Sequence, residues 1–212
     1  MLELGFAETG VQAERYAASP SLLFALKVTE RTGVRVHTLA LRCQLRIEPQ
    51  RRHYSATEEA GLRDLFGEPV RWGNTLRPLQ FAQASALLPG FTGAADVALS
   101  VPCSYDTDVA ATKYFRALDG GEIPLLLLFS GTVFYAAGSG LQIEAVPWDR
   151  ELSVRLPVAV WREAIDLHFP RAGWLRLHDD TVTALERYRS TRMLPDWDST
   201  LLTLLTDARE RA

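Results

Sequence analysis

Cysteine, lysine and long apolar runs are scarce in this chain of 212 residues. The two cysteines, Cys43 and Cys103, form no CxxC pair and have no metal-ligand spacing, which excludes a disulfide framework and a zinc-finger module. The apolar runs are far shorter than the roughly 20 residues of a membrane-spanning helix. The N-terminal residues show no basic segment followed by an apolar one, so the sequence predicts no signal peptide and favours the cytoplasm.

Positive charge is also limited. The formal net charge is −3, and Lys27 and Lys113 are the only lysines, so arginine carries nearly all of the positive charge. A nucleic-acid-binding protein usually presents a basic face, and this charge balance argues against one. The sequence therefore points to neither nucleic acid nor a membrane as the partner.

Catalytic motifs are absent as well. The chain contains no G-x-S-x-G, Walker loop, dinucleotide fingerprint or H-E-x-x-H, so we predict no catalytic residue, no cofactor and no metal site. If folding assembled an acid–base site, its groups would come from Asp106, Asp108, His168 and Asp179. His168 and His178 could also meet near Asp179-Asp180 to bind a metal, although capping or solvated positions suit these residues better.

Strand and helix patterns, in contrast, are abundant. From Val97 to Tyr105, apolar and polar residues alternate with the period of a strand that lies with one face on a core. Asp106 is placed to cap a following helix, which Gly120-Gly121 would end. Residues 123–129 are apolar on both faces, which predicts a central strand covered from both sides.

Further strands follow from the same alternation. They cover residues 22–29, 39–48, 79–88, 141–145 and 152–156. Thr32-Gly33 indicates that the first two of these form an antiparallel hairpin, with a bulge near His37. Both cysteines lie on apolar strand faces and are expected to be buried, and redox coupling between them is the alternative. Residues 1–18 show no period and predict a loosely held arm.

Helix signals occur in two parts of the chain. Ser55 and Glu58 form a capping-box signature, which predicts a helix that Gly67 ends. After Pro157 the period changes to that of a helix, and we expect three helices there, the last two capped by Asp179 or Asp180 and by Asp196.

These elements predict an α+β fold that is mainly β. Residues 1–157 would form an antiparallel immunoglobulin-like β-sandwich with an inserted helix and loop segment at about 49–90. Residues 158–212 would form a helical extension packed on the sandwich, within a single structural unit.

Two resemblances support this reading. The segments VALSVPCSYDTDVAATKYFRAL, GGEIPLLLLFSGTVFY and LQIEAVPWDRELSVRLP resemble the water-stress and late-embryogenesis type 2 domain, which implies an immunoglobulin-like sandwich. A second set resembles an uncharacterised bacterial family met beside nickel–iron hydrogenase genes in high-GC Gram-positive bacteria. Its segments are LALRCQLRIEPQRRHYS, LFGEPVRWGNTLRP, EIPLLLLFSGTVF and LPVAVWREAIDLHFP. This resemblance implies an accessory or assembly role around a hydrogenase, and it gives no catalytic residues to carry over to this chain.

One loop combines the residue types of a binding surface. Arg71, Trp72, Asn74 and Arg77 lie in a loop between the predicted helix and strand, and Trp and Arg dominate interface hot spots. We expect these four residues to bind a partner and Trp72 to be partly exposed, although such a tryptophan could also close the end of a sandwich. The basic run at residues 46–53 is a second candidate, for an anion or nucleic acid.

The sequence thus predicts a non-enzymatic binding or assembly protein. The expected partner is another protein, namely a hydrogenase component or a factor of its assembly. A holding chaperone for unfolded chains, or an enzyme with a site assembled only in the fold, are the alternatives. A contiguous exposed apolar surface would favour the chaperone.

Overall fold

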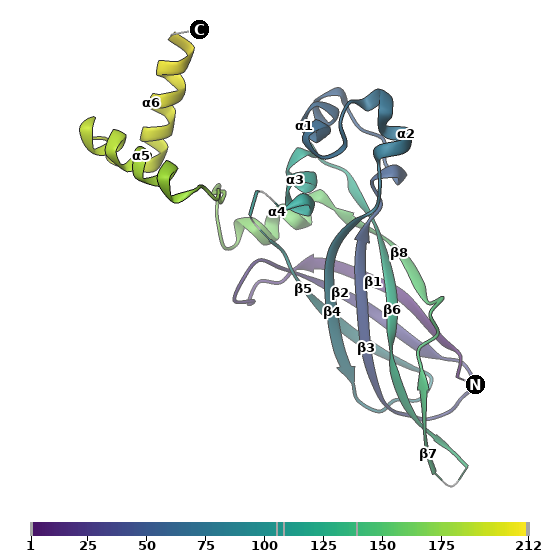
Figure 1. Cartoon of the computed structure of the whole chain (residues 1–212). Helices are drawn as coiled ribbons and strands as arrows, with labels where there is room; N and C mark the ends of the chain where they lie inside the picture. The colour runs from purple at the N-terminus through teal and green to yellow at the C-terminus, as the bar shows by residue number, and fades with distance from the viewer. Residues whose placement is uncertain (1, 105, 108, 139, 211–212) are drawn as a thin grey trace. The chain divides into compact units, whose positions relative to one another are not determined.

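The computed structural model describes residues 2–104, 106–107, 109–138 and 140–210. The chain divides into two compact units, Met1–Trp174 and Leu175–Ala212. The first unit contains two antiparallel sheets, as Figure 1 shows. The prediction of an α+β, mainly β fold is confirmed. Tyr105 of the predicted strand and Asp108 of the acid–base group lie outside the described residues, as does Ser139, where Ala137-Gly138-Ser139-Gly140 indicates a hairpin turn.

One sheet has three strands, in the order β1-β2-β5. They are β1 (Leu4–Ala13), β2 (Ser21–Glu30) and β5 (Ala94–Pro102). The other sheet has five, in the order β4-β3-β6-β7, with β8 also paired to β6. They are β3 (Val36–Ile47), β4 (Leu79–Leu88), β6 (Glu122–Ala137), β7 (Gly140–Ala145) and β8 (Glu151–Pro157).

The core lies between the two sheets. Phe6 of β1 stacks on Phe129 of β6, with ring centroids 4.1 Å apart, so side chains of the two sheets meet face to face. Leu41 and Leu45 of β3 are buried, as the alternation predicted, and Leu99 and Val101 are buried on β5. The alternation therefore identified the inward faces correctly.

The predicted hairpin of residues 22–48 is wrong. Strand β2 pairs with β1 and β5, whereas β3 pairs with β4 and β6 in the other sheet. The connection is a corner between sheets, organised by the buried carboxylate of Glu30. Its oxygens accept from the backbone N–H groups of Thr32 (3.0 Å) and Val34 (3.1 Å). An alternating pattern states which face is apolar but not which strand lies beside it.

The predicted N-terminal arm is also wrong, because residues 4–13 form β1 along the edge of β2. The register shifts between Glu8 and Gly10, so one residue is added within the strand. Such a bulge exchanges the faces on either side of it, which explains why the sequence shows no continuous period. The bulge predicted near His37 is confirmed by a register shift between Val36 and Thr38.

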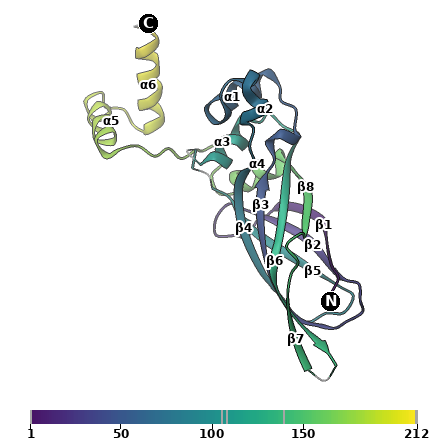
Figure 2. The same ribbon diagram turned by 45° about the vertical axis from the view of Figure 1, so that its right-hand side comes forward.

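Helices of the first unit gather at one end of the sheets, and the tip formed by β6 and β7 lies at the other end, as Figures 1 and 2 both show. These helices are α1 (Ala56–Phe66), α2 (Trp72–Thr75), α3 (Ala110–Ala117) and α4 (Val158–Asp166). Short 3-10 turns span Pro49–Arg51 and Pro69–Arg71.

The predicted helix caps are confirmed at α1 and wrong at α3. Ser55 and Glu58 form a complete capping box at the start of α1. At α3 the N-cap is Val109, without a side-chain hydrogen bond, and Asp106 instead forms a β-bridge with Trp174. The backbone of Asp106 is therefore drawn toward the segment after α4, which no local pattern could indicate.

Helix α4 belongs with the sheets, because it contacts β1, β2 and β8 and buries Trp161 and Ile165. The boundary between the two units therefore falls after Trp174 and not at residue 157. The second unit contains α5 (Asp179–Thr191) and α6 (Trp197–Glu210), joined by a hydrogen bond of 3.0 Å from Tyr188 Oη to Asp207 Oδ2. Asp196 caps α6 by accepting from Ser199 N at 2.7 Å, as predicted.

Candidate functional site

The tryptophan expected at a binding surface is part of the core. Trp72 begins α2, and only 8% of its surface is exposed. Its Nε1–H donates to the Gly67 carbonyl oxygen at 2.9 Å, and its ring packs edge-on against Tyr54 and Phe66. The expected exposure of Trp72 is therefore wrong, because the 3-10 turn at Pro69–Arg71 returns the indole over α1.

The other residues of that loop are exposed. Arg71 ends the 3-10 turn before α2, Asn74 lies on α2, and Arg77 precedes β4. They flank a tryptophan that is almost entirely buried. Their role in partner binding stays a prediction, but it loses the aromatic anchor on which it depended.

The predicted basic run forms internal ion pairs. Arg51 pairs with Glu48, and Arg52 pairs with Glu58 at 2.5 Å. Arg52 also donates to the carbonyl oxygens of Gly120 (2.7 Å) and Glu122 (2.6 Å), and its side chain is 12% exposed. Arg52 therefore fastens the start of α1 to the start of β6 and is not available to an external anion.

The carboxylate of Glu58 completes this arrangement. It accepts from the backbone N–H groups of Ser55 (3.0 Å) and Asp119 (2.9 Å). Burial alone would raise its pKa, but these hydrogen bonds and the charge of Arg52 outweigh burial, so the pKa of Glu58 lies below its usual value. The folded state therefore holds Glu58 ionised.

Two tyrosines adjoin the ion pair. The hydroxyl groups of Tyr54 and Tyr114 are 2.8 Å apart, and Tyr54 donates to the Pro49 carbonyl oxygen at 2.7 Å. Burial raises the pKa of both phenols. We call the five residues Arg52, Tyr54, Glu58, Trp72 and Tyr114 the Arg52 cluster. Arg52 pairs with Glu58 and Tyr54 with Tyr114, which is the arrangement of a structural network, although Arg52 Nε has no hydrogen-bond partner in the described structure.

The cysteines lie where the alternation placed them. Cys43 is on β3 and Cys103 follows β5, and both are buried free thiols. Burial raises the pKa of each thiol to about 12. Because the thiolate is the reactive form, neither thiol is activated in the folded state.

The histidine and aspartate candidates are divided between the two units, with Asp106 and His168 in the first. His168 Nε2 lies 2.9 Å from the Ala17 carbonyl oxygen, so this histidine fastens the β1–β2 connection to the end of α4. His178 and Asp179 belong to the second unit. Within the described part of the chain, no group of three or more His, Cys, Asp or Glu side chains could hold a metal ion.

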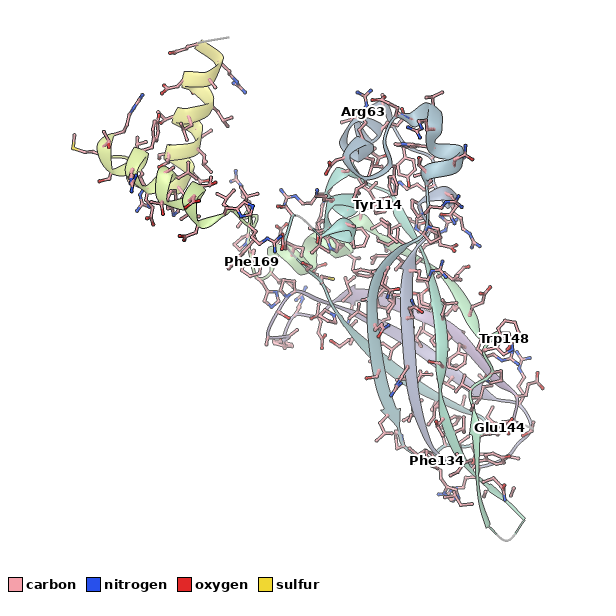
Figure 3. All side chains as sticks on the ribbon, viewed as in Figure 1. Arg63, Tyr114, Phe134, Glu144, Trp148 and Phe169 are labelled. Carbon is pink, nitrogen blue, oxygen red and sulfur yellow. The ribbon has the colours of Figure 1, made fainter. Side chains whose placement is uncertain are left out.

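The surface that sequence reasoning missed lies at the β6–β7 tip. Leu141 (57% exposed) and Ile143 (65% exposed) project from β7, and Phe134 of β6 lies directly across from Ile143. We call Phe134, Leu141 and Ile143 the β7 face. Figure 3 labels Phe134 on this hairpin and the exposed Trp148 on the loop that follows it.

The inward side of β7 carries a polar residue, Glu144, whose carboxylate has hydrogen-bond partners. Glu144 Oε2 accepts from Tyr135 Oη at 3.2 Å and lies 3.4 Å from the backbone nitrogen of Leu2. Apolar residues therefore face outward on this strand and a polar one faces inward, the reverse of an ordinary half-buried strand. The pattern Leu-Gln-Ile-Glu-Ala predicted a strand here but not this orientation, since a period of two does not state which face is buried.

The outer edge of β7 carries no other strand. In the described sheet, β7 pairs with β6 alone. Val146 N donates to Gly131 O at 3.0 Å, so by the alternation of an antiparallel ladder Glu144 and Gln142 also direct their backbone groups to β6. The backbone groups of Leu141 and Ile143 then face the open edge, where an extended chain could pair with them.

These features define a class, namely a β-sheet scaffold closed by helices at one end and presenting an apolar edge strand at the other. The chain belongs to the family of unknown function DUF6084, whose model matches residues 1–212. No curated protein matches the chain. A crystal structure described as that of an ApaA protein from Bordetella pertussis is 9% identical, with 74% of this chain and 95% of that chain covered. Its TM-score of 0.27 carries no argument about fold or function.

No described helix is long and apolar enough to cross a membrane.

Proposed function

We propose that this protein is a non-enzymatic binding or assembly protein that pairs the open edge of β7 with an extended segment of a partner protein. One observation carries the proposal: β7 is an edge strand with outward-facing Leu141 and Ile143 and with no Lys, Arg or Pro between Gly140 and Ala145. Natural proteins usually protect exposed edges with such residues or with a covering segment. An apolar edge without Lys, Arg, Pro or a covering segment is therefore a candidate for strand addition.

The chemistry of the edge limits the partner. Backbone hydrogen bonds along β7 would require an extended chain, and the β7 face would select apolar side chains at alternate positions of that chain. The β7 strand carries no cation for phosphate groups, so a protein segment suits it better than a nucleic acid. We propose that the two sheets are an immunoglobulin-like sandwich that serves as the scaffold.

The identity of the partner is supported by sequence alone. The resemblance to a family met beside nickel–iron hydrogenase genes supports a hydrogenase component or a factor of its assembly. Two buried free thiols agree with a location in the cytoplasm, where thiols stay reduced.

The test compares the edge with an exposed apolar residue elsewhere. Full-length protein is used to capture partners from the native host, and captured proteins are identified by mass spectrometry. Ile143→Lys should abolish capture of the specific partner, because a charge would replace the centre of the β7 face. Ile143→Pro should do the same by removing an edge-facing N–H. Val70→Lys changes a side chain that is exposed on the helical end and should leave capture intact.

Amide exchange then distinguishes strand addition from other binding. With the captured partner bound, the amides of Leu141 and Ile143 should exchange more slowly. A partner that remains bound to Ile143→Lys and Ile143→Pro, or that leaves these amides unprotected, would overturn the proposal.

The β7 face also favours a second candidate, the holding chaperone, since an exposed apolar surface can retain unfolded chains. A chaperone would suppress aggregation of unrelated unfolded proteins, and Ile143→Lys would remove that effect. A binding protein of the kind proposed would leave such aggregation unchanged.

A further inference from the structure

A cavity with a volume of about 390 Å³ lies beside α3, α4 and the loop that follows α4. Three arginines line it: Arg116 from α3, Arg162 from α4 and Arg171 from the loop. Asp166 is the only acidic residue in this wall. Three guanidinium groups and one carboxylate give the wall a formal charge of +2, whereas the whole chain carries −3.

Arg162 is held in a fixed orientation. Its Nη1 donates to the Asp119 carbonyl oxygen at 3.1 Å, and its Nη2 donates to that of Leu118. These two bonds connect it to the end of α3 and leave its other N–H groups unassigned. The cation is thus positioned by neutral carbonyl groups and keeps its charge for a ligand.

Arg116 and Arg171 are less constrained. Neither forms an ion pair within the described part of the chain. The guanidinium group of Arg116 lies against Gly173, where an added Cβ would be 3.3 Å from Nη1, so the glycine permits this close approach. Arg171 has a φ of 55°, in the left-handed region that residues other than glycine rarely adopt. Such backbone conformations are found preferentially at ligand sites.

A buried donor adjoins the three arginines. Trp161 lines the cavity, is 5% exposed, and its Nε1 has no hydrogen-bond partner in the described structure. Buried donors are normally paired. The indole and Ile165 also give the cavity an apolar side next to the cations.

We propose that this cavity is a binding site for a small organic phosphate, with the phosphate group between Arg116 and Arg171 and the organic group toward Trp161. Planar guanidinium groups match the oxygen geometry of phosphate and can bind it in a bidentate manner. A wall with a charge of +2 matches a phosphate dianion better than a carboxylate monoanion. The site is separate from the β7 face and does not depend on the function proposed for that face.

The first experiment uses inorganic phosphate as the probe. ¹⁵N-labelled full-length protein is titrated with phosphate, with acetate and with sodium chloride at matched ionic strength. Phosphate should shift the amide resonances of Arg171 and Gly173 and the indole N–H resonance of Trp161, with saturation near 1 mM, on the order of a weak specific site. Trp161→Phe assigns the indole signal.

Variants test whether the arginines hold the anion. Arg116→Gln and Arg171→Gln should each raise the Kd for phosphate about 10-fold, because each removes a charge-assisted donor pair. Arg77→Gln removes an exposed arginine outside the cavity and should leave the Kd unchanged. All three substitutions are on exposed side chains and should leave the melting temperature unchanged.

Three outcomes would overturn the proposal. Phosphate could produce no saturable shift at the cavity, Arg77→Gln could weaken binding as much as the cavity variants, or acetate could bind as tightly as phosphate. The first two would indicate only general attraction of anions, and the third would exclude selection of a dianion.

Discussion

The Arg52 cluster and the β7 face each lie in the environment that their residue types would not suggest. The segments that supply the cluster contain Arg, Glu, Tyr and Trp, residue types common at binding surfaces, yet the fold buries them. The segment that supplies the β7 face resembles an ordinary core strand, yet its leucine and isoleucine are exposed. Residue type alone therefore does not show whether a side chain has a structural role or binds a partner. The role of a side chain depends on whether the fold places a partner group beside it.

Cysteine labelling gives the largest expected difference between interior and edge. Raised pKa values of about 12 leave almost no thiolate on Cys43 or Cys103 near pH 8. An exposed cysteine introduced by Ile143→Cys should react with iodoacetamide on the order of 10³-fold faster than either, since its pKa would be near 8.5. Mass spectrometry of labelled peptides measures all three rates.

In denaturant the three rates should become equal. Fast labelling of Cys43 or Cys103 in the native protein would mean that the strand faces are assigned wrongly.

Removal of the buried indole is the next largest effect. Trp72→Ala should lower the free energy of unfolding by about 3–5 kcal/mol, because it leaves a cavity beside Tyr54 and Phe66. Urea denaturation measures the loss. Arg71→Ala, one residue earlier and exposed, is the matched control and should change stability by less than about 0.5 kcal/mol. Similar stability in both variants would restore the loop as a binding surface.

Acid should weaken the Arg52 cluster through Glu58. At pH 7, Glu58→Gln should cost about 3 kcal/mol, because it leaves Arg52 partly buried without its counter-charge. The folded pKa of Glu58 is lowered, so its stabilisation is complete above the unfolded pKa of about 4.3 and is lost as the pH falls through the folded value.

The stability difference between the natural protein and Glu58→Gln should therefore shrink as the pH falls below about 5. Urea denaturation at several pH values measures it, with Glu59→Gln as the neighbouring control. A difference that stays constant with pH would show that Glu58 acts through its shape and not through its charge.

The smallest effect is expected at the edge. Ile143→Lys should change the free energy of unfolding by less than about 0.5 kcal/mol, since the side chain is exposed. Leu41→Ala on the buried face of β3 should cost about 2–5 kcal/mol in the same assay. A large loss with Ile143→Lys would mean that the β7 face supports the fold instead of serving a partner.

Interactions between residues close in the sequence predicted many of the helix caps and inward strand faces. The capping box at Ser55, the cap at Asp196 and the inward side chains of β3 and β5 each follow from interactions within a few residues. The arginine-lined cavity was less predictable from the sequence. Arg116, Arg162 and Arg171 come from separate elements, and no spacing in the sequence relates them.

The sequence by itself determined which segments extend, which coil, and which strand faces carry apolar residues, because these depend on neighbouring residues. The tertiary structure decided which strands pair, since Glu30 directs the chain from one sheet into the other. It also decided that Arg52 is internal, because its carbonyl partner Gly120 lies 68 positions along the chain. Strand β7 remains exposed for the same reason: the fold supplies it with one neighbour, β6, and whether a second strand covers an edge is decided by distant segments.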